Sequence, residues 1–440
     1  MQIILLSGGS GQRLWPLSNG VRSKQFIKFL RSADGSYCSM LQNVYSKLKS
    51  LNKEIQLTVT TSKNQVSAIH NQIGTDVSVC VEPTRKDTFP AILLASLFLR
   101  DVKKVDLDEP VVICPVDPYV DEKFFVSLMD LGKLVESNKA NLSLLGIEPT
   151  YPSEKYGYII PNSTQKISDV LMFKEKPNEA TARKYLKQGA LWNGGVFAFK
   201  LRYLIEKAHE AVNFEDYYDL YKNYDKLDKI SFDYAIAEKE KKIQVMRYVG
   251  EWKDLGTWNT LTESMPEHII GKGILDEKCK NTHILNELDI PVLGLGLKNL
   301  IVAASPQGIL VSDKEESAHI KPFVEKMSQR IMFAEKSWGK YQVLNVSDNS
   351  LTVLISLKKG QEMTYHSHDR RQEVWTITSG KGIAVLDGIP QPVEAGDIIS
   401  IDAGCKHTLI ADTELKAIEV QLGKDISVHD KHKYQLEKSR

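Results

Sequence analysis

The sequence predicts an α/β domain at the N-terminus, a small β segment after it and an antiparallel β-barrel at the C-terminus. Short apolar runs alternate with segments of helical periodicity in the first half of the chain. Short apolar stretches between Gly, Asn and Asp follow, and closely spaced glycine turns separate the strands of the last part. A chain of 440 residues suits two or three domains, and we place them at 1–270, 271–330 and 331–440.

The apolar runs of the first region have the length of buried strands. They cover residues 2–6, 57–61, 77–81, 111–114 and 142–147, and helical patterns cover residues 39–51, 90–102 and 122–137. Strands that alternate with helices favour an open sheet covered on both faces. Because ligands of such sheets bind beyond the carboxyl ends of the strands, the loops after residue 6 and after Cys114 are the candidate sites.

The rest of the chain has a different pattern of apolar residues and turn signals. Short strands at 292–297 and 300–302 suggest a small β-helix-like unit, and residues 315–329 have a helical pattern. From Met332 onward, turn signals recur at Gly339, Gly360, Gly380, Gly388, Gly396 and Gly404. That spacing is typical of an antiparallel sandwich or barrel.

Composition excludes several classes of protein. A formal net charge of +1 gives no global field for nucleic acid or an anionic membrane. The five cysteines are scattered and odd in number, which favours reduced thiols. The N-terminus has no basic start, its apolar run is too short for a signal peptide, and no run approaches the ~20 apolar residues of a membrane span. We therefore expect a soluble cytoplasmic protein without nucleic-acid or membrane partners.

The first candidate site is the glycine loop, residues 7–13. Gly8, Gly9, Ser10 and Gly11 would let backbone N–H groups approach a polyphosphate, because glycine has no Cβ. Arg13, and Lys24 farther along, could neutralise charge on a departing pyrophosphate. A glycine loop alone is as often a tight turn, and this one is neither a Walker A loop nor Gly-x-Gly-x-x-Gly.

The longer run does carry a specific resemblance. Residues 8–18, followed by Lys24-Gln25-Phe26, resemble the signature of sugar nucleotidyltransferases in the mannose-1-phosphate guanylyltransferase branch, with Ser23 in place of a proline. Further segments match in the same order, over roughly residues 1–325: 82–91, 115–117, 155–159, 173–177, 192–197 and 252–258. The resemblance implies a Rossmann-like mixed sheet and the transfer of a nucleotide from a nucleoside triphosphate, GTP in that branch, to a sugar 1-phosphate, mannose 1-phosphate.

The resemblance also implies roles for individual residues. It implies nucleotide binding by Glu82, Pro83 and Thr88, sugar binding by Gly157, Glu175 and Asn193, a catalytic role for Lys176, and Mg²⁺ binding by Asp117 and Asp254. Taken alone, Asp117 would be a turn or cap residue about as often as a ligand. Lys86, Asp87 and Phe89 depart from the family's Arg, Asn and Ala, so another nucleobase or sugar stays open. A regulatory sugar-nucleotide binding protein is a further alternative, although intact Lys24, Asp117 and Asp254 favour turnover.

The C-terminal region offers a second site. His366 and His368 would share one face of a strand, and Glu373 and His407 could complete a site for a divalent transition metal such as Zn²⁺. The surrounding glycine spacing resembles the cupin superfamily. Its place behind the first domain resembles chains fused to a mannose-6-phosphate isomerase.

The isomerase pattern is only partly kept, because Asp369, Arg370 and Val374 replace family histidines. Two interpretations of the cupin therefore stay open. It could isomerise a 6-phosphosugar, or it could be a metal-bearing or empty cupin that serves dimerisation, as a possible homodimer, or regulation.

Overall fold

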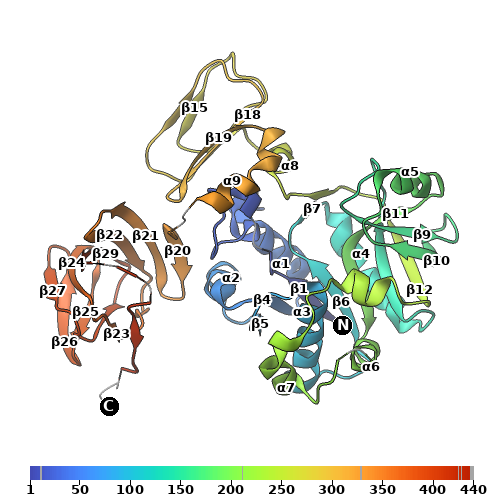
Figure 1. The fold of residues 1–440 in the computed structure, drawn as a ribbon, viewed down its shortest axis with the longest axis horizontal. Helices are drawn as coiled ribbons and strands as arrows, with labels where there is room; N and C mark the ends of the chain where they lie inside the picture. Colours follow the sequence, from blue (N-terminus) through green and yellow to red (C-terminus); the bar gives the residue numbers. More distant parts are fainter. Residues whose placement is uncertain (10–11, 211, 328–329, 425, 428, 437–440) are drawn as a thin grey trace. The chain divides into compact units, whose positions relative to one another are not determined.

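The computed structural model describes residues 1–9, 12–210, 212–327, 330–424, 426–427 and 429–436. The chain forms two compact units (Figure 1). The first contains Met1–Gly11 and Lys24–Pro266, and the second contains Gln12–Ser23 and Glu267–Arg440. None of the five cysteines forms a disulfide. The described residues include no helix with the length and hydropathy needed to cross a bilayer.

The first unit is built on one mixed β-sheet with the strand order β5-β4-β1-β6-β11-β8-β12-β10-β9. Strands β5, β4, β1 and β6 run parallel, whereas β11 is antiparallel to both β6 and β8. The strands are β1 (Gln2–Leu6), β4 (Gln56–Ser62), β5 (Ser78–Glu82), β6 (Pro110–Pro115), β8 (Leu142–Ile147), β9 (Gly157–Pro161), β10 (Ile167–Lys174), β11 (Leu191–Lys200) and β12 (Ile243–Tyr248). The prediction of an α/β domain with a mixed sheet is confirmed.

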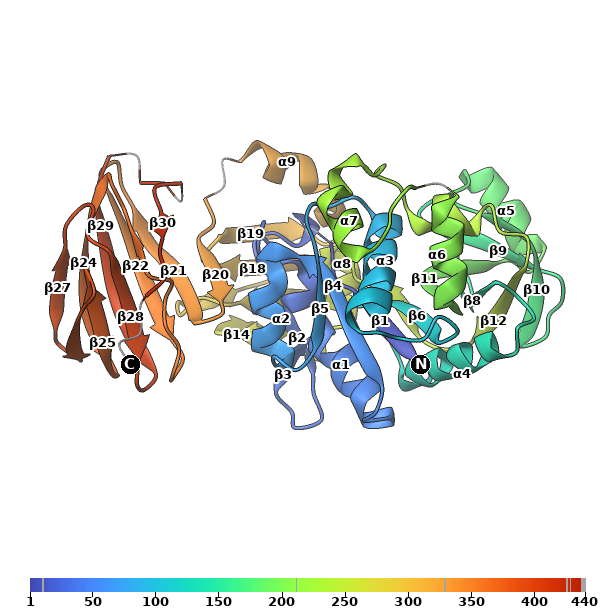
Figure 2. The ribbon, with the colours of Figure 1, turned by 90° about the horizontal axis from the view of Figure 1, so that it is seen from below.

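Helices cover both faces of this sheet (Figure 2). In β1, Ile3 and Leu5 pack with one layer of helices, while Ile4 packs with the other, as the two-residue period of a strand requires. The first layer comprises α1 (Met40–Leu51), α2 (Val66–Ile73) and α4 (Glu122–Glu136); the second comprises α3 (Thr88–Leu97), α6 (Leu201–His209) and α7 (Tyr217–Lys222). The continuous apolar strands of the sequence are thus buried on both sides.

Local sequence explains where these helices begin. Ser39 caps α1 through a capping box with Gln42, and Asp121 caps α4 by accepting from Lys123 N. Helix α3 continues beyond Leu97 as a π-helical turn, Phe98–Val102, which completes the expected helix over 90–102. Further elements of this unit include α5 (Glu179–Lys187), α8 (Trp258–Glu263), and the strand pairs β2 (Lys28–Arg31) with β3 (Tyr37–Ser39) and β7 (Pro118–Val120) with β13 (Trp252–Asp254).

The second unit begins with short stacked strands. β14 (Ile269–Gly271), β16 (His283–Asn286) and β18 (Leu300–Ser305) pair in parallel, and β19 (Gly308–Asp313) closes the sheet antiparallel to β18. β15 (Gly273–Leu275) pairs in parallel with β17 (Val292–Gly294). Successive coils add one strand to the β14-β16-β18 stack and, in two of them, a second strand to the β15-β17 pair, which is the β-helix-like arrangement that the sequence suggested. The helical pattern at 315–329 gives two short pieces instead, the 3₁₀ helix η7 (Glu316–His319) and α9 (Lys321–Lys326), where a proline starts the second.

The segment Gln12–Ser23 is held by this β-helix-like region. Ser305 Oγ donates to the carbonyl of Pro16 at 2.7 Å. Arg22 donates to both carboxylate oxygens of Glu287, at 2.7 and 2.8 Å. A segment that begins in the glycine loop is thereby anchored to residues nearly 300 positions later.

The C-terminal barrel consists of two sheets, ordered β20-β21-β22-β29-β24-β27 and β26-β25-β28-β23-β30. The expected turn glycines, from Gly339 to Gly404, all have positive φ, which explains why glycine occupies these positions. The strands are β20 (Phe333–Lys336), β21 (Gly339–Val346), β22 (Ser350–Leu357), β23 (His366–Ser367), β24 (Arg371–Ser379), β25 (Lys381–Leu386), β26 (Ile389–Glu394), β27 (Ile398–Ile401), β28 (His407–Ala411), β29 (Leu415–Gly423) and β30 (His432–Lys433). The predicted antiparallel barrel is confirmed.

Candidate active site

An open cavity of about 330 Å³ lies at the carboxyl ends of β1 and β6, where ligands of open α/β sheets bind. Gly8 and Gly9 of the glycine loop line it, and among the described residues a Cβ at Gly9 would meet no atom within 4 Å. At these two glycines the cavity therefore reaches the backbone. Ser10 and Gly11 lie outside the described residues, and Arg13 is exposed in the 3₁₀ helix η1 (Gln12–Leu14) of the second unit.

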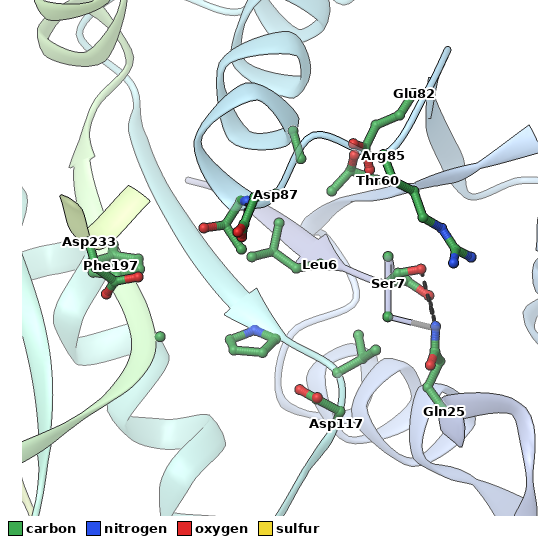
Figure 3. Close-up of a pocket in the computed structure, with 17 residues that line it drawn as sticks. Leu6, Ser7, Gln25, Thr60, Glu82, Arg85, Asp87, Asp117, Phe197 and Asp233 are labelled. Carbon is green, nitrogen blue, oxygen red and sulfur yellow. Dashed lines mark hydrogen bonds between the residues drawn. The ribbon is translucent and has the colours of Figure 1, made fainter. Parts of the chain in front are cut away.

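Glu82 supplies a buried carboxyl group to this cavity. It ends β5, is 4 % exposed and accepts a hydrogen bond from the Tyr224 hydroxyl at 2.9 Å. Burial raises the pKa of Glu82 to about 7. In Figure 3, Glu82 lies near the top of the view and Asp117 near the bottom, so the cavity extends from one carboxyl group to the other.

Thr88 and Pro83 are the other two residues that were expected to bind the nucleotide with Glu82. Thr88 lines the cavity, and its Oγ1 accepts from the backbone N–H of Phe232 at 2.8 Å. Pro83 follows Glu82 but is not among the residues that line the cavity.

The three departures from the family pattern have different environments. Asp87 lines the cavity with φ +79°, and its carboxylate accepts from Thr88 N at the start of α3. Lys86 donates to the Asp225 carbonyl at 2.7 Å, and Phe89 is buried in the core. Only Asp87 changes the charge of the cavity wall.

Asp117 and Asp254 meet because β7 and β13 pair antiparallel, with Pro118 opposite Asp254. Lys24 Nζ lies 2.9 Å from Asp117 Oδ2 and 3.4 Å from Asp254 Oδ1. Burial would lower the pKa of Lys24, but the two carboxylates outweigh it and raise that pKa. Two carboxylates that converge on one cation form a donor set suited to Mg²⁺ with substrate phosphates, so the residues fit the ion that the resemblance implied.

Strand pairing also gathers the expected sugar-binding residues. Asn193 of β11 stands opposite Gly157 of β9, and Glu175 directly follows β10, the other neighbour of β9. A Cβ at Gly157 would lie 2.5 Å from Glu175 Oε2 and 3.3 Å from Asn193 Cβ. Gly157 is therefore required for the carboxylate of Glu175 to occupy its present position.

Lys176 extends this group. Its Nζ lies 2.6 Å from Glu175 Oε1, and its φ of +44° is a conformation that costs energy for any residue except glycine. Burial would lower the pKa of Lys176, but the hydrogen bond to Glu175 and the charge of Glu175 raise it. A half-exposed cation thus lies beside a buried carboxylate, where it can meet an incoming anion.

A separate cluster lies inside the barrel of the second unit. His366, His368 and His407 are buried, and each offers a ring nitrogen within 4.8 Å of the others. Each Nδ1 contacts a backbone carbonyl, that of Thr364, Asp430 or Cys405, which leaves each Nε2 as an acceptor. Burial lowers the pKa of His366 to about 2 and that of His368 to about 4, so both are neutral at pH 7.

Glu373 adds a carboxylate to the cluster, and its contacts indicate whether the cluster fits a metal. Its Oε2 lies 3.3 Å from His407 Nε2, and these two buried atoms have no hydrogen-bond partner in the described part of the chain. Two facing acceptors can share a cation between them. Three neutral imidazoles and one carboxylate are a donor set for Zn²⁺ or a similar ion. Arg371 contacts the same carboxylate at 3.0 Å and His368 Nε2 at 2.8 Å.

Comparison with protein families identifies the first unit. Residues 2–269 match the nucleotidyl transferase family, and residues 353–421 match the cupin domain. The chain belongs to the nucleotidyl transferase family. The resemblance drawn from its motifs is thereby confirmed, as is the cupin in the second unit.

Two curated relatives match this chain over nearly the full length of both chains. A mannose-1-phosphate guanylyltransferase of Salmonella montevideo is 29% identical, over 98% of each chain. One of Salmonella typhimurium is 28% identical, over 96% of this chain and 94% of the relative. A crystal structure titled mannose-1-phosphate geranyltransferase, from Thermus thermophilus, is 26% identical with a TM-score of 0.61, and the match covers 74% of this chain and 98% of that one.

The site of this nucleotidyl transferase contains residues that sequence reasoning missed. Tyr224 supports Glu82, Arg85 and Asp233 line the cavity, and Gln25 donates to both oxygens of Ser7, at 3.1 and 3.2 Å (Figure 3). Gln25 stands in the Lys24-Gln25-Phe26 motif, so its signal was available. Tyr224 and Asp233 lie between the matched segments and have no local sequence signal.

Proposed function

We propose that this chain transfers the nucleotidyl group of a nucleoside triphosphate, GTP by preference, to a sugar 1-phosphate, mannose 1-phosphate by preference. The observation that carries the proposal is the meeting of Lys24, Asp117 and Asp254 in the unit whose cavity is lined by Glu82 and the glycine loop. The names of the full-length relatives support the choice of guanine and mannose.

The reaction joins one oxygen of the sugar phosphate to the α-phosphorus and breaks the bond from the α-phosphorus to the pyrophosphate oxygen. Such a displacement needs alignment and charge neutralisation rather than a covalent intermediate. Lys24 supplies a fixed positive charge, and Lys176 can bind the phosphate of the attacking sugar. When bound by Asp117 and Asp254, Mg²⁺ would supply further positive charge to the phosphate oxygens.

The preference for guanine follows from the chemistry of Glu82. Guanine presents N1–H and an exocyclic N–H as neighbouring donors on one edge, and a carboxylate can accept both. Adenine presents an acceptor at N1, which a carboxylate would repel. Donors on guanine would also stabilise the charged form of a carboxyl group whose pKa burial has raised to about 7.

A pyrophosphate-release screen tests the proposal. The full-length protein with Mg²⁺ is assayed with GTP, ATP, CTP and UTP against mannose, glucose and galactose 1-phosphates. We expect the highest kcat/KM for GTP with mannose 1-phosphate. Release with another pair would keep the reaction class and replace the substrates, whereas no release with any pair would refute the proposal.

The variants Lys24→Ala and Asp117→Ala test whether the reaction takes place in this site. Each variant removes charge stabilisation from the reacting phosphates, so we expect kcat to fall by at least about 100-fold while the fold is retained. Lys47→Ala is the matched control, because Lys47 pairs with the exposed Glu122 and does not line the cavity. Unchanged turnover in both site variants would exclude the assignment.

For the cupin we propose a bound divalent transition metal, and isomerisation of a 6-phosphosugar as its second activity. The metal is supported by the facing acceptors of Glu373 and His407. The isomerase is supported by cationic groups near that centre. Arg371 donates a hydrogen bond to Glu373, and Lys431 interacts electrostatically with Glu373 and Arg371. Both cations suit a phosphate group. Aldose–ketose interconversion by the full-length protein with added metal tests the activity, and metal-loaded protein without conversion would contradict it.

A further inference from the structure

Asp233 is a cavity residue to which no role has been given. It begins the π-helical turn η6 (Asp233–Ala237), lines the cavity and is partly buried. Figure 3 shows it beside Phe197, on the side of the cavity away from Arg85. The turn is fixed on both sides, because Phe232 N donates to Thr88 Oγ1 and Glu238 N donates to the Asp233 carbonyl. Its carboxylate is therefore held at the wall.

Asn193 holds the side chain of Asp233. Asn193 Nδ2 donates to Asp233 Oδ1 at 2.5 Å, and Asn193 Oδ1 accepts from Gly195 N at 3.2 Å. The amide orientation is thus set by one partner on each side. Ser231 also donates to the Asp233 carboxylate. Since a carboxylate offers about four acceptor positions, Asp233 keeps acceptor capacity for a ligand.

The charges around Asp233 define which ligand group suits it. Burial, and next the negative charge of Glu175, raise the pKa of Asp233 to about 7, while Lys176 acts in the opposite direction. Two carboxyl groups in one wall disfavour an anionic group such as a phosphate. They favour neutral hydrogen-bond donors, and hydroxyl groups are the donors that a sugar ring provides.

We propose that Asp233 accepts hydrogen bonds from ring hydroxyls of the sugar substrate and thereby selects among sugar epimers. This inference rests on the proposed nucleotidyl transfer to a sugar 1-phosphate. Asn193, Gly157 and Glu175 form one group, and Asp233 joins it through Asn193, which places the carboxylate with the sugar ring. The ribose of the nucleotide also carries hydroxyls, and it is distinguished by experiment.

Steady-state kinetics of Asp233→Asn in the full-length protein test the assignment. The amide keeps the size of the side chain but puts N–H donors where acceptors are needed. We expect the KM for mannose 1-phosphate to rise at least about 10-fold, with the KM for GTP within about twofold of wild type. The ratio of kcat/KM for mannose 1-phosphate to that for glucose 1-phosphate should fall at least about 10-fold.

Asp130→Asn is the matched control, because Asp130 lies on the surface of α4 and its ion pairs with described residues are the long ones of 3.8 and 3.9 Å with Lys133 and Lys166. It should change none of these values. If Asp233→Asn does not fold, Asp233→Ala replaces it, with the same expected rise in KM. A rise in the KM for GTP alone would assign Asp233 to the ribose and overturn the proposal, as would unchanged sugar selectivity.

Failure of the underlying reaction gives a different result. If the wild-type protein releases no pyrophosphate, the proposed function is wrong. Calorimetric titration of wild type and Asp233→Asn with mannose 1-phosphate then decides the inference on binding alone. Equal affinity of the two proteins would overturn it, and a loss of about 10-fold or more would support it.

Discussion

At the scale of single residues, Glu82 illustrates how a buried carboxyl group in a cavity wall opposes stability. Its carboxyl group is 4 % exposed, with the Tyr224 hydroxyl as a hydrogen-bond donor. Because burial raises its pKa to about 7, from an ordinary value of 4.5, the folded protein holds this proton more tightly than the unfolded chain does. The free energy of unfolding therefore falls as pH rises between about 4.5 and 7, and the penalty stays at higher pH.

Glu82→Gln should separate these two effects. The amide cannot ionise, so the variant should be more stable than wild type at pH 8, by up to roughly 3 kcal/mol, and closer to wild type at pH 4.5. It should also lower kcat/KM for GTP by roughly 10- to 100-fold and that for UTP much less, because one acceptor for guanine becomes a donor. Thermal unfolding at the two pH values and pyrophosphate release measure this. A uniform loss with all four nucleotides would exclude Glu82 from base selection.

At the scale of elements, three strands position the residues expected to bind the sugar. β9 pairs with both β10 and β11, so Gly157, Glu175 and Asn193 meet although they are far apart in the sequence. The motifs predicted a shared role for these residues because each stands in a recognisable run of residues at a strand, and that role stays a prediction. Asp233 could not be found in this way, since it comes from an irregular turn that only tertiary packing brings to Asn193.

Gly157→Ala should displace the neighbouring residues that are expected to bind the sugar, and it should leave the residues that are expected to bind the nucleotide unchanged. The new Cβ would lie 2.5 Å from Glu175 Oε2 and 3.0 Å from Phe173, so the carboxylate must move. We expect the KM for the sugar 1-phosphate to rise about 10-fold or more, with little change in the KM for GTP. Gly20→Ala is the control, because a Cβ there meets no atom within 4 Å and φ is not positive. Normal sugar kinetics in Gly157→Ala would show that Glu175 does not contact the sugar.

At the scale of the whole molecule, the sequence predicted the two sheet architectures well. Hydrophobic periodicity locates strands and helices, and the glycine turns of the barrel require positive φ, so both could be read locally. The attachment of residues 12–23 to the second unit could not, because it depends on contacts such as Ser305 with Pro16. The helix expected at 315–329 is divided for a local reason, the proline at the start of α9.

The metal proposed for the barrel should stabilise the second unit. Because His366 and His368 are neutral at pH 7, they need not lose protons to bind an ion. At a Zn²⁺ concentration of 100 times its Kd, the free energy of unfolding of that unit should rise by about 2.7 kcal/mol. Calorimetry of metal-free and metal-loaded protein measures the shift, which His366→Ala should abolish and His319→Ala, at an exposed position, should not. An equal shift in both variants would place the ion elsewhere.

The attachment of residues 12–23 has a consequence for how such chains can evolve. The glycine loop begins in the first unit, but the segment that follows it packs with Ser305 and Glu287 of the second. A recombination event that exchanged the coding sequence for residues 1–270 as a cassette would separate Arg22 from Glu287 and Pro16 from Ser305. The two parts must therefore be inherited together or readapted at these contacts, which favours vertical descent of the whole gene over shuffling of its domains.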